Sequence, residues 1–187
     1  MGINRSFFFQ QTRATLFAGR LAEGQTRGMA AILDRWEQAH ASADDRWLAY
    51  MLATVHHETD KKFAGIREYG HGRGKPYGRP VPPHGHVYYG RGFVQLTWKE
   101  NYQKMSPVCG ADLVANPDLA LELSHCVRIL FHGMIHGSFT GRKLADYFNP
   151  ARENWVEARR IINGLDKAHL IADHARRFYA AISYTTG

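Results

Sequence analysis

Two glutamates ten residues apart, Glu58 and Glu68, have the side chains and the spacing that acid–base chemistry requires. Glu58 follows Met51 by seven residues and Val55 by three, so its carboxyl shares the apolar face of an expected helix. It also lies near the C-terminal end of that helix, where the helix dipole disfavours an anion. Both effects favour the protonated form of a carboxyl group, which is the form that a general acid needs. An ordinary ion pair is the alternative, with partners among Arg46, Lys61 and Lys62.

Glu68 opens a stretch rich in glycine and proline, where Arg67 is expected to favour its ionised form. Glycoside hydrolysis uses two carboxyl groups in different environments: a protonated one in an apolar wall acts as the acid, and an ionised one in a polar loop acts as the base or nucleophile. Inversion at the anomeric carbon requires carboxyl groups about 6.5–9.5 Å apart, whereas a gap of about 5 Å indicates a covalent intermediate. A surface glutamate neutralised by Arg67 is the alternative interpretation.

Segment 88–102 concentrates aromatic, amide and hydroxyl side chains within 15 residues. Aromatic faces stack on sugar rings, and amide groups bond to hydroxyl and N-acetyl groups. On these grounds we expect Tyr89, Arg91 and Trp98 to contact a substrate. The same side chains are suited to stacking nucleic-acid bases, or to forming a core at a strand-to-helix junction, and the pattern does not separate the three interpretations.

Histidines raise the alternative of a metal site. Five of them lie near the two glutamates in the sequence: His56, His57, His71, His84 and His86. The His-Glu-x-x-His motif of zinc peptidases is absent, because Lys61 stands three residues after Glu58. A zinc-dependent enzyme, such as an amidase or peptidase of the bacterial cell wall, stays an alternative. Histidines that face solvent or substrate are the favoured interpretation. We therefore expect no metal and no cofactor.

The elements that must position these residues are helices on both sides of an irregular lobe. Apolar residues recur at helical spacing over residues 3–16, 25–40, 46–58, 119–134 and 166–183, and a further helix is expected to start at Asn149-Pro150. Segment 65–92 holds too much glycine and proline for a long helix, so we expect loops with a short hairpin around residues 87–89. The prediction is a mainly α, two-lobed helical domain whose small loop or hairpin lobe flanks a cleft.

Length and composition bound the class of protein. The chain has 187 residues, of which 44% are hydrophobic and 22% are charged. This length and composition indicate one globular domain over residues 1–187, and we expect no separate domain that binds a cell wall. No apolar run approaches the roughly 20 residues of a membrane span, and no signal peptide is recognisable. Two cysteines are too few for a disulfide scaffold, so we expect synthesis in a reducing cytoplasm. The net charge of +7 implies a polyanionic partner.

The central segment reads Tyr88-Tyr89-Gly90-Arg91-Gly92-Phe93-Val94-Gln95-Leu96-Thr97-Trp98. This string closely resembles the signature of glycoside hydrolase family 19, the lysozyme-like chitinases. Four further segments resemble that family in the same order: His57-Glu58-Thr59, Asn116-Pro117-Asp118-Leu119, Ser138-Phe139-Thr140 and Ile161-Ile162-Asn163-Gly164. The resemblance covers over half of the chain and implies a lysozyme-like fold with glycosidase activity.

The resemblance also implies roles for particular residues. Glu58 corresponds to the general acid of the family, and Glu68 corresponds to its second carboxylate, the general base. Thr97 corresponds to a hydroxyl residue that helps to position the nucleophilic water. Three more residues correspond to cleft positions that hold water or sugar, namely Gln95, Asn101 and Asn163.

The short interval between the glutamates and the N-terminal segment Ile3-Asn4-Arg5-Ser6-Phe7-Phe8-Phe9 resemble compact bacteriophage endolysins of this superfamily. We therefore expect a muramidase that cleaves the β-1,4 link between N-acetylmuramic acid and N-acetylglucosamine in peptidoglycan and so lyses bacteria. A chitinase acting on N-acetylglucosamine polymers is the first alternative, and a nucleic-acid-binding module is a further one.

Charge and the absence of an export signal guide the remaining expectations. Peptidoglycan is anionic and chitin is neutral, so a basic protein suits peptidoglycan strands as its partner. The chain is expected to accumulate in the host cytoplasm and to reach the wall through a separate pore, as a monomer and without a nucleic-acid partner. Weak contact with an anionic membrane is compatible with Arg176 and Arg177 opposite Ile171 and Phe178, although packing in the core is the favoured role of that last helix.

Overall fold

The structure is a computed structural model that describes residues 2–185. Within that range, helices dominate and the strands are short, so the expected mainly α fold class is confirmed. The six α-helices of the described residues are α1 (Arg5–Leu16), α2 (Glu23–Ala39), α3 (Asp45–Glu58), α4 (Lys99–Cys109), α5 (Leu123–His136) and α6 (Ala168–Ala181). The same part of the chain has four strands, which are β1 (Ile66–Arg67), β2 (Arg91–Gly92), β3 (Phe148–Asn149) and β4 (Arg152–Glu153). Short 3₁₀ helices are η1 (Pro76–Gly78), η2 (Pro117–Leu121), η3 (Leu144–Asp146) and η4 (Glu157–Ile161).

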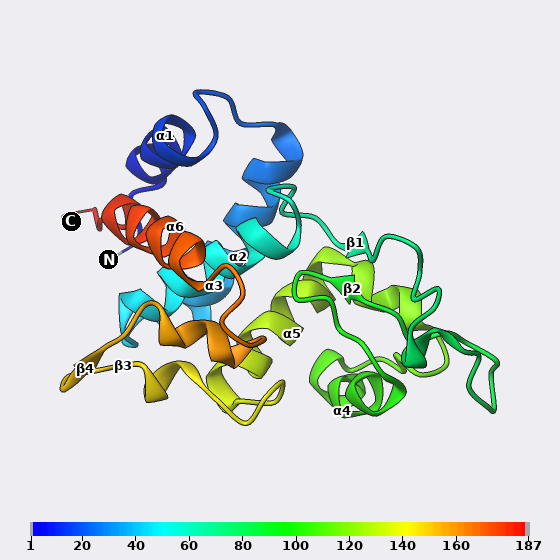
Figure 1. Cartoon of the computed structure of the whole chain (residues 1–187). Coiled ribbons are helices and arrows are strands. Elements are labelled where there is room, and N and C mark those ends of the chain that lie inside the picture. The colour runs from blue at the N-terminus through cyan, green and yellow to red at the C-terminus, as the bar shows by residue number, and fades with distance from the viewer. Residues whose placement is uncertain (1, 186–187) are drawn as a thin grey trace.

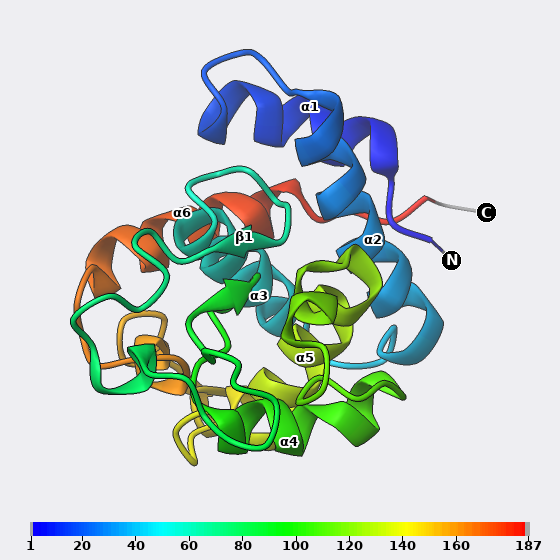
Figure 2. The same ribbon diagram turned by 90° about the vertical axis from the view of Figure 1, so that its right-hand side faces the viewer.

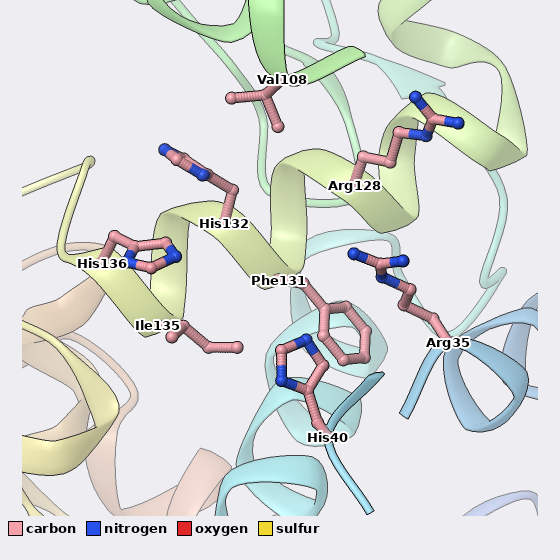
Figure 3. Close-up of a pocket in the computed structure, with 8 residues that line it drawn as sticks. All are labelled: Arg35, His40, Val108, Arg128, Phe131, His132, Ile135 and His136. Atoms are coloured by element: carbon pink, nitrogen blue, oxygen red, sulfur yellow. The ribbon is translucent and has the colours of Figure 1, made fainter. Parts of the chain in front are cut away.

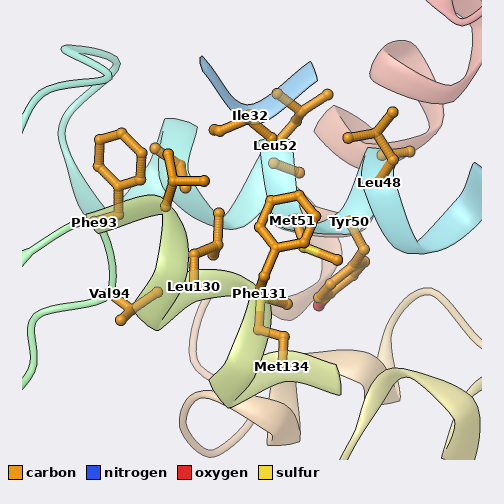
Figure 4. Close-up of a cluster of buried hydrophobic side chains, with 14 of the residues drawn as sticks. Ile32, Leu48, Tyr50, Met51, Leu52, Phe93, Val94, Leu130, Phe131 and Met134 are labelled. Atoms are coloured by element: carbon orange, nitrogen blue, oxygen red, sulfur yellow. The ribbon is translucent and has the colours of Figure 1, made fainter. Parts of the chain in front are cut away.

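Helix α3 is the central element of the helical body. Every residue from 48 to 56 is buried, and a helix that is apolar on all sides must be enclosed by its neighbours. Asp44 caps its first turn by accepting a hydrogen bond from the backbone N–H of Arg46. Figure 4 shows Leu48, Met51 and Leu52 of α3 beside side chains from α2 and α5. The helix that carries Glu58 is therefore anchored along its length.

The two lobes are visible in Figure 1, where α1, α2, α3 and α6 form one group and α4 lies with the loops near β1 and β2. Helix α5 runs between the two groups, and the turned view in Figure 2 brings the loop lobe to the front. Buried side chains of the loop lobe, Phe93 and Val94, belong to the same apolar cluster as Leu130 of α5. The loop lobe is thus packed onto the helical body through a shared core.

Helix α6 packs its apolar face against α3 and α1. Ile171, Ala175 and Phe178 are buried, and the Phe178 ring stacks on Phe8 with centroids 6.3 Å apart. This apolar face is occupied by the core, as the favoured interpretation of the last helix requires, and it is not free to enter a membrane. In the part of the chain that the structure describes, no helix has the length and apolar character of a membrane span.

The irregular lobe is held by pairing at its two ends. Strands β1 and β2 are antiparallel, with Ile66 opposite Gly92 and Arg67 opposite Arg91. An isolated bridge joins Val81 to His86. The hairpin expected around residues 87–89 does not form there. The carbonyl groups of residues 87 and 89 accept hydrogen bonds from the Arg91 side chain, and the Tyr88 carbonyl accepts one from the N–H of Trp98.

Two helix boundaries differ from the sequence-based expectation. The segment after Asn149-Pro150 is a β3–β4 hairpin rather than a helix, because the Asn149 side chain accepts a hydrogen bond from the N–H of Ala151 and forms a turn. The helix expected over residues 119–134 is divided into η2 and α5. Glu122 between them has an extended backbone with φ −66° and ψ 136°.

Candidate active site

A cavity of about 410 Å³ brings together residues from the two lobes. One wall comes from segment 94–101 and Tyr77, and the other comes from Phe139, Ile162 and Asn163. Five residues expected at the site share this cavity: Gln95, Thr97, Trp98, Asn101 and Asn163. Asn163 is far from the other four in sequence, so only the fold brings it to them.

A tight, strained turn builds the first wall. The backbone of Arg91 and the backbone of Leu96 exchange two hydrogen bonds, with N···O distances of 2.8 and 3.2 Å. Gln95 at φ 53° and Trp98 at φ 73° both adopt the left-handed region that favours glycine. Such strain is kept only where the surroundings determine it, and it is frequent at functional sites. The Gln95 amide donates to the Gly92 carbonyl at 3.1 Å, which fixes the side chain within the turn.

The Thr97 hydroxyl has a defined orientation. It donates a hydrogen bond to the Gln95 carbonyl at 2.8 Å, so the lone pairs of its oxygen stay available to accept from a water or a sugar hydroxyl. The Asn101 side-chain amide donates to the Thr97 carbonyl at 2.7 Å from the first turn of α4. The start of α4 therefore holds this part of the cavity wall.

The Glu68 carboxylate is held through both of its oxygens. The Tyr77 hydroxyl donates to Oε1 at 2.8 Å, and the Gly90 backbone N–H donates to Oε2 at 3.0 Å. Arg67, the partner expected from the sequence, pairs instead with Asp118 at 2.7 Å, so that expectation is wrong. The antiparallel register explains it, because neighbouring residues of a strand point to opposite faces. Tyr77 lines the cavity, so it connects Glu68 directly to the cavity wall.

Tyr77 is suited to remain a hydrogen-bond donor. Burial and the neighbouring Glu68 carboxylate raise the pKa of Tyr77 to about 12, so its hydroxyl keeps its proton at neutral pH. Its ring meets the Trp98 ring edge to face, with centroids 5.3 Å apart. Both rings therefore border the same cavity from the loop lobe.

Glu58, the last residue of α3, forms an ion pair with Arg159 of η4. The Nη1–Oε1 distance is 2.6 Å, and the side chains are only 4% (Arg159) and 16% (Glu58) exposed. The partner is none of the three cations expected from the sequence, and a buried guanidinium replaces the purely apolar environment. The Arg159 carbonyl accepts from the N–H of Asn163 at 3.1 Å. One residue thus links Glu58 to the second wall of the cavity.

Arg91 and Tyr89 lie behind the cavity rather than in it. Arg91 is 6% exposed, pairs with Asp118 at 2.8 Å and donates to the Tyr102 hydroxyl at 3.0 Å. Its guanidinium covers the Tyr89 ring at 3.7 Å, and that ring also stacks on His71 with centroids 4.8 Å apart. The expectation that Arg91 and Tyr89 bind substrate is therefore corrected. Arg91 supports the turn from behind, because its N–H groups are bonded within the protein, and the Tyr89 ring is packed against Arg91 and His71.

Asp118 is the acidic partner that this support requires. Burial acts to raise the pKa of Asp118, but hydrogen bonds from Arg67 and Arg91 outweigh it and leave the pKa below the usual range. The carboxylate therefore stays ionised between the two guanidiniums. The motif Asn116-Pro117-Asp118 was recognised by resemblance, whereas its function in bracing the loop lobe becomes visible only in the structure.

Sequence reasoning gave no role to Tyr77, Phe139, Ile162 and Arg159. Phe139 belongs to a segment noted for its resemblance, and its ring packs directly on Gly133 of α5. A Cβ atom at Gly133 would lie 1.9 Å from the ring, so only glycine at this position leaves room for Phe139 in the cavity wall. Tyr77 and Arg159 had no usable signal, because each acts through a contact to a residue outside its own element.

The histidines do not converge on a metal site. Within residues 2–185, no group of three or more His, Cys, Asp or Glu side chains could hold a metal ion. His56 lies in the core against Phe17 and His174, with ring centroids 5.3 and 4.5 Å away. The His84 and His86 rings stack on each other at 5.7 Å. The positions of these side chains therefore speak against the zinc alternative.

The fold agrees with comparisons to known proteins. Residues 37–131 match the family described as Chitinase class I, and the chain belongs to glycoside hydrolase family 19. Chitinase 11 of Oryza sativa subsp. japonica is 39% identical over 74 residues, which are 40% of this chain and 29% of the rice protein. The match thus spans less than a third of that relative.

Solved structures match over nearly the whole chain. The crystal structure of a bacterial family 19 chitinase has a TM-score of 0.65 at 24% identity, covering 98% of this chain and 96% of that one. Chitinase C from Streptomyces griseus HUT6037 has a TM-score of 0.64 at 23% identity, covering 98% of this chain and 78% of that one. These similarities confirm the fold that the sequence resemblance implied.

Proposed function

We propose that this chain is a glycosidase that hydrolyses β-1,4 links in an N-acetylated glycan, with Glu58 as general acid and Glu68 as general base. The observation that carries the proposal is the attachment of Glu68 to the cavity. Tyr77 binds its carboxylate and also lines the 410 Å³ cavity in which Gln95, Thr97 and Asn163 meet. A carboxylate fixed beside a groove of amide and aromatic groups is suited to activate water next to a bound sugar.

Glu58 would protonate the oxygen of the leaving sugar. After it gives up this proton, Glu58 is a carboxylate, and the Arg159 guanidinium at 2.6 Å stabilises that charge. Arg159 is itself oriented by a hydrogen bond from its Nε to the Asp166 carbonyl at 3.1 Å. The pair thus favours the product side of the proton transfer, which lowers the barrier to it.

Glu68 would remove a proton from the attacking water. The donors on both oxygens fix the direction of the remaining lone pairs, so the carboxylate does not have to reorganise when the proton arrives. Thr97 would orient the same water, because its hydroxyl donates backwards to Gln95 and accepts towards the cavity. Attack on the face opposite to the leaving group gives inversion.

The other cavity residues supply sugar contacts. Trp98 is 45% exposed at the rim and offers a flat apolar face. Gln95, Asn101 and Asn163 bear amide groups, which match the hydroxyl and N-acetyl groups of the substrate. Both sides of the groove therefore contribute polar contacts.

We further propose that the natural substrate is peptidoglycan. From Tyr69 to Lys99 inclusive the sequence has five Lys and Arg residues and no Asp or Glu. Arg91 is neutralised by Asp118, but Arg73, Lys75 and Arg79 are exposed on the segment that carries Tyr77. A cationic loop beside the groove favours a glycan with carboxylates along its length, as peptidoglycan has.

Chitin is the second candidate substrate. The rice and Streptomyces griseus relatives are both named chitinases, and the polar groove is equally compatible with N-acetylglucosamine polymers. The two substrates differ in charge, so the cationic loop is the feature that separates them. Removing its charge should affect the cleavage of peptidoglycan far more than the cleavage of chitin oligomers.

The test is mass spectrometry of digested peptidoglycan after reduction of the new ends. Fragments that end in reduced N-acetylmuramic acid are the expected result. Fragments that end in reduced N-acetylglucosamine would still indicate a glycosidase, but one that cleaves the other glycosidic bond. Free peptides with intact glycan strands would contradict the two-carboxylate mechanism. Release from chitin oligomers alone would favour the second candidate.

A further inference from the structure

A second pocket, with a volume of about 320 Å³, lies between α2, α4 and α5. Figure 3 shows α5 crossing it, with Arg128 at one end and His136 at the other. Arg35 and His40 approach from α2 and the residue after it, and Val108 closes the pocket from α4. None of its lining residues belongs to the cavity beside Tyr77. The pocket is therefore a separate feature of the fold.

The pocket has basic groups and no acidic ones. Of the eight lining residues, two are arginines and three are histidines, and the rest are apolar. Within residues 2–185, no carboxylate forms an ion pair with Arg35 or Arg128. Both arginines are exposed residues, whereas buried or half-buried arginines such as Arg46, Arg91 and Arg159 do have such a partner. The two guanidiniums of the pocket are therefore open to an external anion.

The pocket is partly organised before any ligand arrives. Arg128 donates from Nη1 to the carbonyl of Cys109, the last residue of α4, at 3.0 Å. This bond fixes the guanidinium and leaves its other N–H groups unused. The His132 and His136 rings lie one helical turn apart on α5, with centroids 4.7 Å from each other. The His40 ring stacks on Phe131 at 5.2 Å, which holds it at the floor of the pocket.

We propose that this pocket binds a tetrahedral oxyanion, namely a phosphate group, between Arg35, Arg128 and the three histidines. Guanidinium groups form charge-assisted hydrogen bonds to phosphate oxygens, and imidazoles can donate to those that remain. A carboxylate has only two oxygens and would leave part of this donor set unused. A metal cation is disfavoured, because both arginines would repel it.

The protonation of the histidines supports this assignment. Burial lowers the pKa of His40, and repulsion by Arg35 and His136 lowers it further. Burial and then His136 lower the pKa of His132. The charged groups that face these rings are Arg35 on α2 and Arg128 and His136 on α5. A bound anion relieves their mutual repulsion, so binding is coupled to proton uptake, and an anion of constant charge should bind more tightly as the pH falls.

The test is a titration of the full chain, with its histidines labelled by ¹⁵N, with inorganic phosphate at constant ionic strength. We expect saturable shifts of the His40, His132 and His136 imidazole signals. The double variant Arg35→Gln/Arg128→Gln should weaken binding by about tenfold or more, because two charge-assisted contacts are lost. Arg27→Gln, which removes the same charge from an exposed position of α2, should change binding less than about twofold.

Two further arms complete the test. Sulfate keeps its charge over the pH range, so it should bind more tightly at pH 6 than at pH 8, and His132→Gln should reduce this gain. Glycerol phosphate and phosphatidylglycerol vesicles distinguish a soluble phosphate ester from a lipid headgroup as the source of the group. The proposal is overturned if phosphate gives no saturable shift, if the double variant binds as well as the wild type, or if chloride produces the same shifts. Glycan cleavage is not a readout, so the result is independent of the proposed function.

Discussion

Arg159 and Glu58 are 101 residues apart in sequence, and their side chains meet in an ion pair of 2.6 Å at the end of α3. The pair joins the central helix to η4, whose following residues form one wall of the cavity. Glu58 is thereby fixed in the helical body, whereas Glu68 is fixed in the loop lobe by Tyr77 and Gly90. The proposed acid and base are thus held by different lobes, and both are joined to the cavity.

Replacing Arg159 by glutamine should damage both stability and catalysis. The variant leaves Glu58 in a half-buried position without its partner, and breaking such a pair costs about 3 kcal/mol of unfolding free energy. Urea denaturation measures the loss, and kcat for glycan cleavage should fall because the product carboxylate loses its counter-ion. Arg160→Gln is the matched control. Its ion pair with Glu157 is on the surface, so we expect a loss below about 1 kcal/mol. Equal losses in the two variants would contradict the role given to Arg159.

Tyr77→Phe tests how Glu68 is positioned. The variant keeps the ring that faces Trp98 and removes only the hydroxyl that donates to Glu68 Oε1. We expect a stability change of about 1 kcal/mol. The reduction of kcat should be about tenfold or more, with little change in KM, and the acidic limb of the pH–rate profile should move. Tyr69→Phe, at an exposed position beside Glu68, should leave kcat unchanged. An unaltered pH profile in Tyr77→Phe would count against the contact as a catalytic support.

Gly90→Ala tests the close packing between the base and the turn. A Cβ atom there would lie 2.8 Å from Oε1 of Gln95 and 3.3 Å from Cβ of Glu68. The methyl group must displace one of these side chains, so we expect a higher KM and a lower kcat with the fold retained. Gly24→Ala is the control, because a Cβ atom at Gly24 meets open space. Activity equal to the wild type in Gly90→Ala would show that the position of Gln95 is not needed.

The buried His56 predicts how stability depends on pH. Burial, followed by repulsion from His174 and Lys61, lowers the pKa of His56 from 6.5 to about 4. The unfolded chain therefore takes up this proton first as the pH falls. Stability from His56 is fully present above pH 6.5 and is lost between 6.5 and about 4, to a total of about 3 kcal/mol.

Denaturation of His56→Leu at several pH values checks this prediction. The variant should lose less stability than the wild type between pH 6.5 and 4.5, because it has no imidazole to protonate in the core. His174 has a pKa that burial also lowers, so part of the dependence should remain. His169→Leu, at an exposed position of α6, should follow the wild type. If His56→Leu loses as much stability with falling pH as the wild type, groups other than His56 cause the loss.

Much of the architecture was accessible from the sequence, and the reason is periodicity. The apolar stripe that ends at Glu58 predicted α3, because a buried helix must repeat its apolar residues at helical spacing. The motif strings placed Gln95, Thr97, Asn101 and Asn163 in one site, and they share one cavity. Local patterns therefore predict the helices, and short motifs predict most of the residues that line the groove.

The missed features depend on contacts that no local pattern records. Arg159 was expected inside a helix after Asn149-Pro150, whereas that segment turns back as β3 and β4 and then forms η4. Arg67 was assigned to Glu68 because it is next in sequence, although the strand register directs it to Asp118. Arg91 looked like a substrate ligand by its motif and is buried by its partners. In each case tertiary packing determines which neighbour a charge meets.

The most direct test of the central claim compares Glu58→Gln and Glu68→Gln in cleavage of purified peptidoglycan, followed by mass spectrometry of the released fragments. Each variant keeps the size of the side chain and removes its acid–base function. Both should fold with unchanged circular dichroism and lose at least about a thousandfold in kcat/KM, whereas Glu100→Gln, at an exposed position of α4, should cleave as the wild type does. Cleavage at the wild-type rate by either Glu58→Gln or Glu68→Gln would contradict the assignment of these two carboxylates.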